Sequence, residues 1–432
     1  MWIDSLGKGP VRAFSEALRL NRSEEGLLFV PKEFPLIKET PPLSSLPDLA
    51  VSLFRPFFRG DILEPHLPGI CERAFNFSLP LKRLDKLTTL LELFHGPTHA
   101  FKDVGARFLA ECEGKISELE AHDINKLIMV ATSGDTGAAV ASAFYEKPLF
   151  KVLILFPKGQ VSKRQKESLT RWGGNIISFE IEGSFDDCQG LVKQLLKDKE
   201  VKERVKITSA NSINVGRILP QTLYYAYASY LNEKETGKKA NFIIPSGNMG
   251  NSIACFWARE MGCPIDRIYL STNANKAVSN YYETLSYSPC PSIKTLANAM
   301  DVGDPNNMER LLSLYKGREN SLRESSKAVS VSDEEIQKTL LKSLENKGEG
   351  WGVLLCPHTA TAAFVRSLFP DDDFILVGTA HPSKFDEVLS PLLGGKELPL
   401  PSGLKTLVKR TPKFKTIPAD LGIVKQALLQ EL

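Results

Sequence analysis

The chain has 432 residues, of which 42% are hydrophobic, and its 54 basic and 51 acidic side chains leave a formal net charge of +3. This length provides for two or three compact units with large cores. Because charges of both signs are interspersed, we expect no nucleic-acid partner and no membrane-surface partner. The seven cysteines and six histidines are scattered without a CxxC pair or an HExxH motif, so we expect neither a disulfide framework nor a bound metal.

The apolar runs of the chain, such as "LIMVA" and "VLILF", are far shorter than the roughly 18 residues of a membrane-spanning helix. Asp4 and Lys8 precede any hydrophobic run, so the N-terminus does not resemble a secretory signal. We therefore expect an intracellular, cytoplasmic protein.

The first residues, 1–90, predict a supporting N-terminal region and not a free tail, because they contain many apolar side chains. Helical patterns cover 11–20 and 44–58. The stretch 31–47, in contrast, is rich in proline and is expected to be irregular.

From about residue 90, short apolar runs alternate with helix-period segments in two series. Strands that are apolar throughout are buried on both faces, and their alternation with helices predicts parallel sheets. We therefore expect an α/β fold with a smaller domain over 91–215 and a larger domain over 216–432. The expected strands cover 127–131, 150–156, 176–181, 205–208, 241–244, 267–270, 351–356 and 374–378.

Two helical stretches accompany these strands. A long helix over 217–233 separates the two series of strands. The polar stretch 301–345 is also expected to be helical, and Ser332 and Glu335 in it have the spacing of a capping box. In open parallel sheets, ligands bind beyond the carboxyl ends of the strands, so the loops that follow the strands are the places to look for chemistry.

The stretch "HGPTHAFKDVGARFLA" (95–110) places Lys102 at the start of an amphipathic helical run, after a turn through Gly96 and Pro97. A solvated surface lysine needs no such approach. A lysine that forms a covalent bond does, because its amine must be held, partly desolvated and uncharged, against a bound carbonyl. Lys102 is therefore a candidate for that bond if the rest of the chain supplies a cofactor site.

The loop "TSGDTG" (132–137) follows an expected strand and opens a helix. Its backbone N–H groups, with Thr132, Ser133 and Thr136, are suited to bind a carboxylate or a phosphate. Asp135 is already negative, which suits a capping role and weakens the case for pure anion binding. A simple N-cap turn remains the alternative.

Two further loops are candidate anion sites. "SGNMGN" (246–251) precedes a helix expected from about Ser252, and its glycines let the backbone approach phosphate oxygens closely. "NSINVGR" (211–217) presents Ser212 and Arg217, and the arginine can contact a phosphate or a carboxylate with two N–H groups. A tight turn and a surface arginine remain the alternatives.

The loop "VGTAHPSKF" (377–385) holds Thr379 and His381 at the end of a buried strand. A single histidine at such a place is more often structural than catalytic. Together, however, the four loops and Lys102 offer a Schiff-base amine, a phosphate site and a partner for a ring nitrogen. Pyridoxal phosphate requires this set of groups.

At this point the chain resembles a known family. "GPTHAFKDVGARF", "ATSGDTGAA", "SANSIN" with Arg217, "IPSGNMGN" and "GTAHPSKF" are similar to the motif series of threonine synthase, a fold-type-II pyridoxal-phosphate enzyme related to the tryptophan synthase β subunit. The motifs occur in the family's order and cover nearly the whole chain.

The resemblance implies a role for each candidate residue. Lys102 would form the Schiff base with pyridoxal 5'-phosphate, and Thr379 would face the pyridine nitrogen. The "TSGDTG" loop would take the substrate carboxylate, and Ser212 and Arg217 would take the substrate's phosphate. The residues expected to hold the cofactor phosphate are Gly247, Asn248, Met249, Gly250 and Asn251.

The reaction implied is the conversion of O-phospho-L-homoserine and water to L-threonine and phosphate, by a monomer or a homodimer. A sister enzyme that releases 2-oxobutyrate from phosphohomoserine or phosphothreonine remains a close alternative, because it would use the same residues. Threonine dehydratase and cysteine synthase need no second phosphate site and are less favoured. A non-catalytic relative would not need Lys102 together with all four loops.

Overall fold

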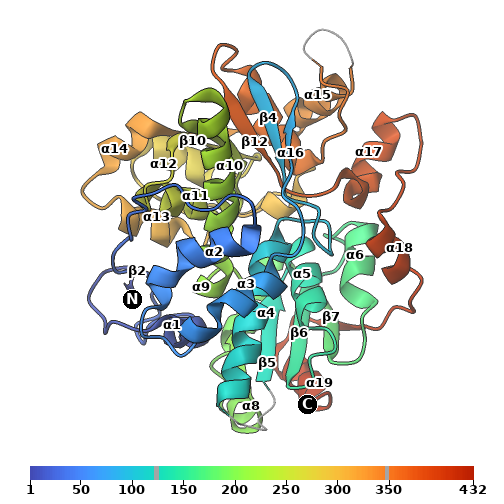
Figure 1. Cartoon of the computed structure of the whole chain (residues 1–432). Coiled ribbons are helices and arrows are strands. Elements are labelled where there is room, and N and C mark those ends of the chain that lie inside the picture. Colours follow the sequence, from blue (N-terminus) through green and yellow to red (C-terminus); the bar gives the residue numbers. More distant parts are fainter. Residues whose placement is uncertain (121–125, 346–349) are drawn as a thin grey trace.

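The computed structural model describes residues 1–120, 126–345 and 350–432, and Figure 1 shows their arrangement. A five-stranded sheet has the order β13-β7-β6-β5-β8, and all its strand pairs are parallel. Its strands are β5 (Lys126–Ala131), β6 (Phe150–Pro157), β7 (Ile176–Glu182), β8 (Lys206–Ser209) and β13 (Lys415–Pro418).

A six-stranded sheet has the order β11-β10-β9-β12-β4-β3, and only its edge strand β3 runs antiparallel to its neighbour. Its strands are β3 (Leu81–Arg83), β4 (Thr88–Glu92), β9 (Ala240–Pro245), β10 (Ile265–Thr272), β11 (Ser326–Ser330) and β12 (Phe374–Gly378). The expected α/β fold with two parallel sheets is therefore confirmed. A small antiparallel pair, β1 (Trp2–Asp4) with β2 (Phe29–Pro31), belongs to the N-terminal region.

Helices surround both sheets, and the cause is the apolar character of the central strands. Every residue of β5 is buried, and Ile128 and Val130 pair in register with Val152 and Ile154 of β6. A sheet buried on both faces needs helices on both sides. The helices of the first half are α1 (Phe14–Leu20), α2 (Leu46–Phe54), α3 (Leu67–Ala74), α4 (Lys102–Leu119), α5 (Asp135–Phe144), α6 (Lys163–Thr170), α7 (Phe185–Leu195) and α8 (Lys199–Arg204), with 3₁₀ turns η1 (Arg55–Phe58) and η2 (Glu64–His66).

The second half begins with a broken helix. The expectation of one continuous helix over 217–233 is wrong, because α9 ends at Ile218. Pro220, which has no N–H to donate, lies in a 3₁₀ turn between α9 and α10. The helices are α9 (Val215–Ile218), α10 (Thr222–Thr236), α11 (Gly250–Glu260), α12 (Ala277–Thr284), α13 (Met308–Leu314), α14 (Glu319–Ser325), α15 (Asp333–Ser343), α16 (Pro357–Ser367), α17 (Asp386–Leu392), α18 (Ser402–Leu407) and α19 (Leu421–Leu429), with η3 (Leu219–Gln221), η4 (Asn298–Met300) and η5 (Pro382–Phe385).

Two further expectations are corrected and one is confirmed. The run 351–356 is not a strand, because it leads into α16 with Cys356 as the N-cap. A strand, β11, forms within the stretch expected to be helical, where it pairs with β10. The capping box is present: the Ser332 N–H donates to Glu335 Oε2 (2.7 Å), and the Glu335 N–H donates to Ser332 Oγ (3.3 Å).

The sheets do not follow the ranges 1–90, 91–215 and 216–432 that the sequence suggests. The hairpin β3–β4 joins the six-stranded sheet, and the C-terminal β13 joins the edge of the five-stranded sheet. Local patterns do not reveal which distant strand a segment will pair with, so strand membership differs from chain order.

The N-terminal region packs on α4, the helix that begins at Lys102 (Figure 1). Phe108 of α4 lies among aromatic rings of this region, with ring centroids 5.4 Å from Phe54 and 5.7 Å from Phe75. Such aromatic contacts stabilise the packing beyond the effect of the buried apolar area alone. The N-terminal region therefore holds the helix that positions the candidate lysine.

Candidate active site

One pocket lies where the carboxyl ends of β5, β9 and β12 meet the start of α4. All the site residues expected from the sequence line it, although they come from five separate segments. They are Lys102, Thr132, Ser133, Asp135, Thr136, Ser212, Arg217, Gly247, Asn248, Met249, Gly250, Asn251 and Thr379.

Lys102 is the first residue of α4, and its side chain reaches the pocket. Its Nζ lies 4.6 Å from the centre of the Phe101 ring and has no hydrogen-bond partner within the described parts of the chain. Burial lowers the pKa of this amine from 10.5 to about 8, with Arg217 and Lys384 acting in the same direction and Asp135 opposing them. An amine with this pKa is partly neutral at physiological pH and can act as a nucleophile and a base.

The turn before Lys102 is shaped by Asp103. The Thr98 N–H and hydroxyl donate to the two Asp103 carboxylate oxygens at 2.8 and 2.7 Å. A Cβ on Gly96 would lie 2.6 Å from Asp103 Oδ2, so a side chain does not fit there. Because residue 96 is glycine, the Asp103 carboxylate can pack against this turn and accept its hydrogen bonds. These contacts fix the direction in which α4 starts.

The loop 247–251 presents a row of free donors to the pocket. Its five backbone N–H groups have no acceptor among the described residues. Met249 has a φ of 60°, in the left-handed region, and this conformation turns the loop into α11. Asn251 accepts the Tyr224 and Tyr225 hydroxyls on Oδ1 at 2.5 and 2.7 Å, while its buried Nδ2 has no partner in the described structure. These donors fit a phosphate group.

The loop 132–137 is partly satisfied by its own side chains. Thr132 Oγ1 accepts the N–H groups of Gly134 and Gly137 at 3.0 and 2.9 Å, so this hydroxyl caps the start of α5. The N–H groups of Ser133, Asp135 and Thr136 have no acceptor within the described parts of the chain. They remain available to an anion at the helix N-terminus.

Arg217 is buried at the wall of the pocket. Its Nη1 donates to the Ala210 carbonyl at 2.5 Å, and its Nε has no partner in the described structure. Burial lowers the pKa of Arg217 to about 10, which leaves it charged at neutral pH. Ser212, on the same loop, accepts a hydrogen bond from Asn307 Nδ2 at 3.1 Å. A buried cation with an unpaired N–H group suits an anionic ligand.

Thr379 lies at the end of β12 and is nearly buried. Its carbonyl accepts the Phe101 N–H at 2.8 Å, and its hydroxyl lies 3.9 Å from the Cys356 sulfur. This backbone bond joins the end of β12 directly to the residue before Lys102. Thr379 and Lys102 therefore line the same pocket from two connected segments.

The histidines near the lysine motif make structural contacts. His95 Nε2 lies 2.7 Å from the Glu92 carboxylate, and His99 Nδ1 donates to the Phe94 carbonyl at 3.2 Å. His381 caps the start of η5, and burial lowers its pKa to about 4. None of the three lines the pocket.

Several residues at the site were not singled out by the sequence. His358 lines the pocket, and burial lowers its pKa to about 4, so its neutral Nε2 accepts the Ala299 N–H at 3.1 Å. Lys384 forms an ion pair with Asp135, and Asn307 bridges two of the candidate loops. His358 follows the run 351–356, for which the sequence predicts a strand, and Lys384 lies within the motif "GTAHPSKF". The sequence therefore carries a signal for Lys384 only.

Comparisons with known proteins agree with this geometry. A family model described as "Pyridoxal-phosphate dependent enzyme" matches residues 75–377, and one described as "Threonine synthase, C-terminal" matches residues 358–428. Threonine synthase from Serratia marcescens is 36% identical over 423 residues, which cover 96% of both sequences.

Solved structures give the same result. The crystal structure of threonine synthase from Escherichia coli matches with a TM-score of 0.89 and 33% identity over 100% of both chains. Threonine synthase with bound PLP from Brucella melitensis matches with a TM-score of 0.90 and 30% identity, over 99% of this chain and 98% of that one.

Fold and site thus define a fold-type-II pyridoxal-phosphate-dependent enzyme. The chain belongs to the threonine synthase family. The family, cofactor and threonine-forming reaction expected from the sequence are thereby confirmed. The described residues contain no helix long and apolar enough to cross a membrane.

Proposed function

We propose that the pocket holds pyridoxal 5'-phosphate and O-phospho-L-homoserine together, and that the chain forms L-threonine and phosphate there. The observation on which this rests is that one unpaired amine, Lys102, lines the same pocket as two groups of unsatisfied N–H donors. One group is the loop 247–251, and the other contains Arg217 and the start of α5. The cofactor and the substrate each carry a phosphate, so two anion sites are needed.

The residues fit the cofactor. The free N–H groups of 247–251 and the unpartnered Asn251 Nδ2 would hold its phosphate, Lys102 would hold its aldehyde carbon, and Thr379 would face its ring nitrogen. When bound, the cofactor supplies an electron sink for carbanions. A neutral hydroxyl at Thr379 does not force the ring to be protonated, so proton placement depends more strongly on the lysine.

The substrate would lie between α5 and Arg217. The N–H groups at Ser133, Asp135 and Thr136 would take its carboxylate, and Ser212 and Arg217 would take its phosphate. Lys102 would accept the protons that leave Cα and Cβ, return one to Cγ after phosphate departs, and return the other to Cα after the addition at Cβ. Water then adds at Cβ.

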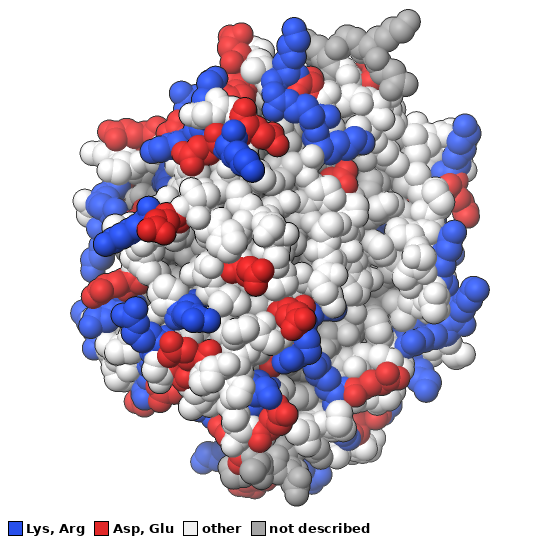
Figure 2. Space-filling view, in the orientation of Figure 1, with Lys and Arg blue, Asp and Glu red and all other residues white. Residues whose placement is uncertain are grey.

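The distribution of surface charge on the face shown in Figure 2 is consistent with a small-molecule substrate. Basic and acidic side chains are interspersed on the face in Figure 2, and neither sign forms a continuous patch there. We infer that the protein acts in the cytoplasm as a monomer or a homodimer, without nucleic-acid partners. We also infer that the working units are the N-terminal region and two α/β domains, one carrying Lys102 and the 132–137 loop and the other carrying the 247–251 loop and Thr379.

The decisive assay is product identity from O-phospho-L-homoserine. L-Threonine supports the proposal, and 2-oxobutyrate would instead assign the phospho-lyase reaction to the same residues. For the site, Arg217→Ala should raise the KM for O-phospho-L-homoserine by at least about tenfold, because a charge-assisted contact is lost, while the cofactor absorbance stays unchanged. Loss of the absorbance as well would show that the two anion sites have been confused.

A further inference from the structure

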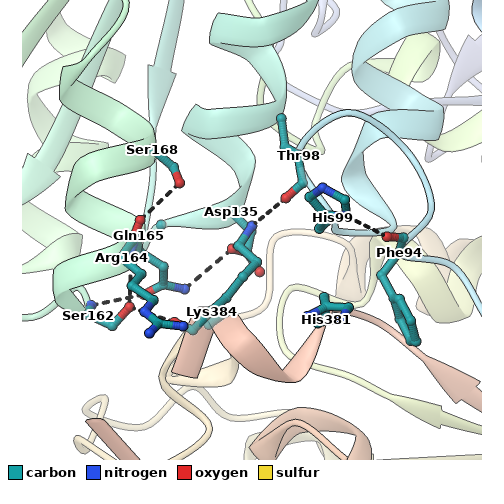
Figure 3. A network of polar contacts seen from close by, with 12 residues as sticks. Phe94, Thr98, His99, Asp135, Ser162, Arg164, Gln165, Ser168, His381 and Lys384 are labelled. Carbon is teal, nitrogen blue, oxygen red and sulfur yellow. Dashed lines mark hydrogen bonds and ion pairs between the residues drawn. The ribbon is translucent and has the colours of Figure 1, made fainter. Parts of the chain in front are cut away.

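A buried ion pair links η5 to the start of α5, whose residue Asp135 lines the pocket. Lys384, in η5 after the last strand of the six-stranded sheet, places its Nζ 2.7 Å from Oδ1 of Asp135, the first residue of α5. The two side chains are only 1% and 4% exposed. Figure 3 shows Lys384 reaching toward Asp135. Burying two charges is unfavourable unless they are well paired, so this arrangement requires an explanation.

Lys384 also contacts the other segments that shape the site (Figure 3). Its Nζ donates to the Thr98 carbonyl at 2.9 Å, in the turn before Lys102. Its own carbonyl accepts the Ser162 hydroxyl at 3.0 Å, at the start of α6. Gln165 of α6 donates to the same Asp135 oxygen at 3.4 Å. Lys384 thus contacts the turn before Lys102, the start of α5 and the start of α6.

The position of Asp135 creates an electrostatic problem for the reaction. The N–H groups at the start of α5 are the donors assigned above to the substrate carboxylate, and Asp135 carries a negative charge among them. A second carboxylate held there would be repelled, and in a desolvated site such repulsion is strong. Burial by itself would raise the pKa of Asp135, but the Lys384 charge and hydrogen bond outweigh it and hold the pKa below its usual value.

We propose that Lys384 is a positioning residue that neutralises Asp135, so that the start of α5 can accept the carboxylate of the amino-acid substrate. This proposal rests on the substrate orientation given under the proposed function. It predicts that the charge balance of the pair, and not the presence of either side chain, determines carboxylate affinity.

The chain contains a matched control. Lys126 and Glu113 form a second buried ion pair, with an Nζ–Oε2 distance of 3.1 Å and exposures of 8% and 0%. Neither residue lines the pocket. Lys126→Met therefore removes a buried lysine from a carboxylate as Lys384→Met does, but without changing the charge at the candidate site.

The experiment is calorimetric titration of the holoenzyme variants with two probes, L-threonine and inorganic phosphate. L-Threonine carries a carboxylate but no phosphate, so it probes the carboxylate site. Inorganic phosphate has no carboxylate, so it probes the phosphate site. We expect Lys384→Met to raise the Kd of L-threonine by at least about tenfold, because it leaves a like charge at the site, and to leave the Kd of phosphate within about threefold of wild type.

The double variant Asp135→Asn with Lys384→Met separates charge from packing. It should return the Kd of L-threonine to within about threefold of wild type, because no net charge remains. Lys126→Met should leave both dissociation constants unchanged. If the double variant binds L-threonine as weakly as Lys384→Met, or if Lys126→Met weakens binding equally, the proposal is wrong.

If Lys384→Met does not fold, the single variant Asp135→Asn tests the proposal. It removes the negative charge of Asp135 and keeps the positive charge of Lys384, so L-threonine should bind at least as tightly as to wild type. Weaker binding by tenfold would overturn the proposal. These outcomes are distinct from failure of the proposed function, which the product assay on the wild-type enzyme reports separately.

Discussion

Lys102 lies half-buried in the pocket wall, and its amine has no hydrogen-bond partner among the described residues. Its pKa of about 8 follows chiefly from desolvation, which disfavours the ammonium form. The sequence indicated such an environment through the glycine–proline turn. It did not reveal that Asp103 binds the turn, because the side chain that caps a turn is evident only once the backbone is folded.

The lowered pKa predicts how the apo-protein takes up its cofactor. Only the neutral amine attacks an aldehyde, so the rate of imine formation with pyridoxal phosphate should rise with pH up to about 8 and then level off. Stopped-flow absorbance between pH 6 and 10 measures this rate. N-acetyl-lysine methylamide corrects for titration of the cofactor itself, and Lys102→Ala should give no imine signal. A rate that still rises above pH 9.5 would contradict the assignment.

At the scale of single elements, close packing of helix α4 against Arg217 is a second feature of the site. A Cβ on Gly105 would lie 2.8 Å from the Arg217 carbonyl oxygen and 2.9 Å from its Nε. Gly105 is one turn after Lys102, so the absence of a side chain brings the lysine and the arginine into one pocket. The helical period of the sequence predicts the helix, but not which residue it approaches.

Gly105→Ala should therefore destabilise the protein by about 1–3 kcal/mol, because the added methyl group meets backbone that must shift. It should also weaken binding of inorganic phosphate. Gly114→Ala, in the same helix with nothing within 4 Å of the added Cβ, should instead stabilise by up to about 1 kcal/mol. Urea unfolding and calorimetric titration measure both effects. If the two variants have equal unfolding free energies and equal phosphate affinities, the close approach of α4 to Arg217 is unimportant.

The loop that bears Ser212 is held by a buried arginine from α13. Arg310 donates to the carbonyls of Phe29, Ser212 and Ile213 at 3.0, 2.9 and 2.7 Å. Burial lowers its pKa to about 9, so it stays charged at neutral pH. The guanidinium therefore ties the N-terminal region to a candidate substrate loop.

Arg310→Met should cost about 3 kcal/mol or more in unfolding free energy, because several buried carbonyls lose their donor. It should also raise the KM for phosphohomoserine, since Ser212 loses its support. Arg366 is an informative control: it is also buried and donates to the carbonyl of Phe369, but it lies outside the pocket. Arg366→Met should destabilise comparably and leave KM unchanged; a matching rise in KM would assign the effect to general loosening.

At the scale of the whole molecule, strand-end loops were the most predictable part. Strands β5, β9 and β12 were expected from their apolar runs, and parallel order brings their carboxyl ends together. The pocket therefore contains every expected site residue, although their individual roles remain predictions. The pairing of β4 with β12, and of β13 with β7, was not predictable, because edge and partner choice depend on contacts between distant segments.

The C-terminal segment is a test of this arrangement. Ile417, Val424 and Leu428 are buried against the five-stranded sheet and α7, and each such side chain contributes about 1.5–3 kcal/mol. Truncation after Arg410 should accelerate amide hydrogen exchange in β7 and α7, while β9 and β10 keep their protection. Equal loss of protection in both sheets would show that the C-terminal segment does not stabilise the five-stranded sheet locally.

The position of β12 between β9 and β4 has a consequence for the newly made chain. Residues 88–92 are synthesised long before their parallel neighbour, residues 374–378. Since Thr379 directly follows that neighbour, a nascent polypeptide shorter than about 380 residues lacks one wall of the coenzyme pocket. The complete wall of this pocket therefore requires that residues 374–379 have been synthesised and have paired with β4 and β9.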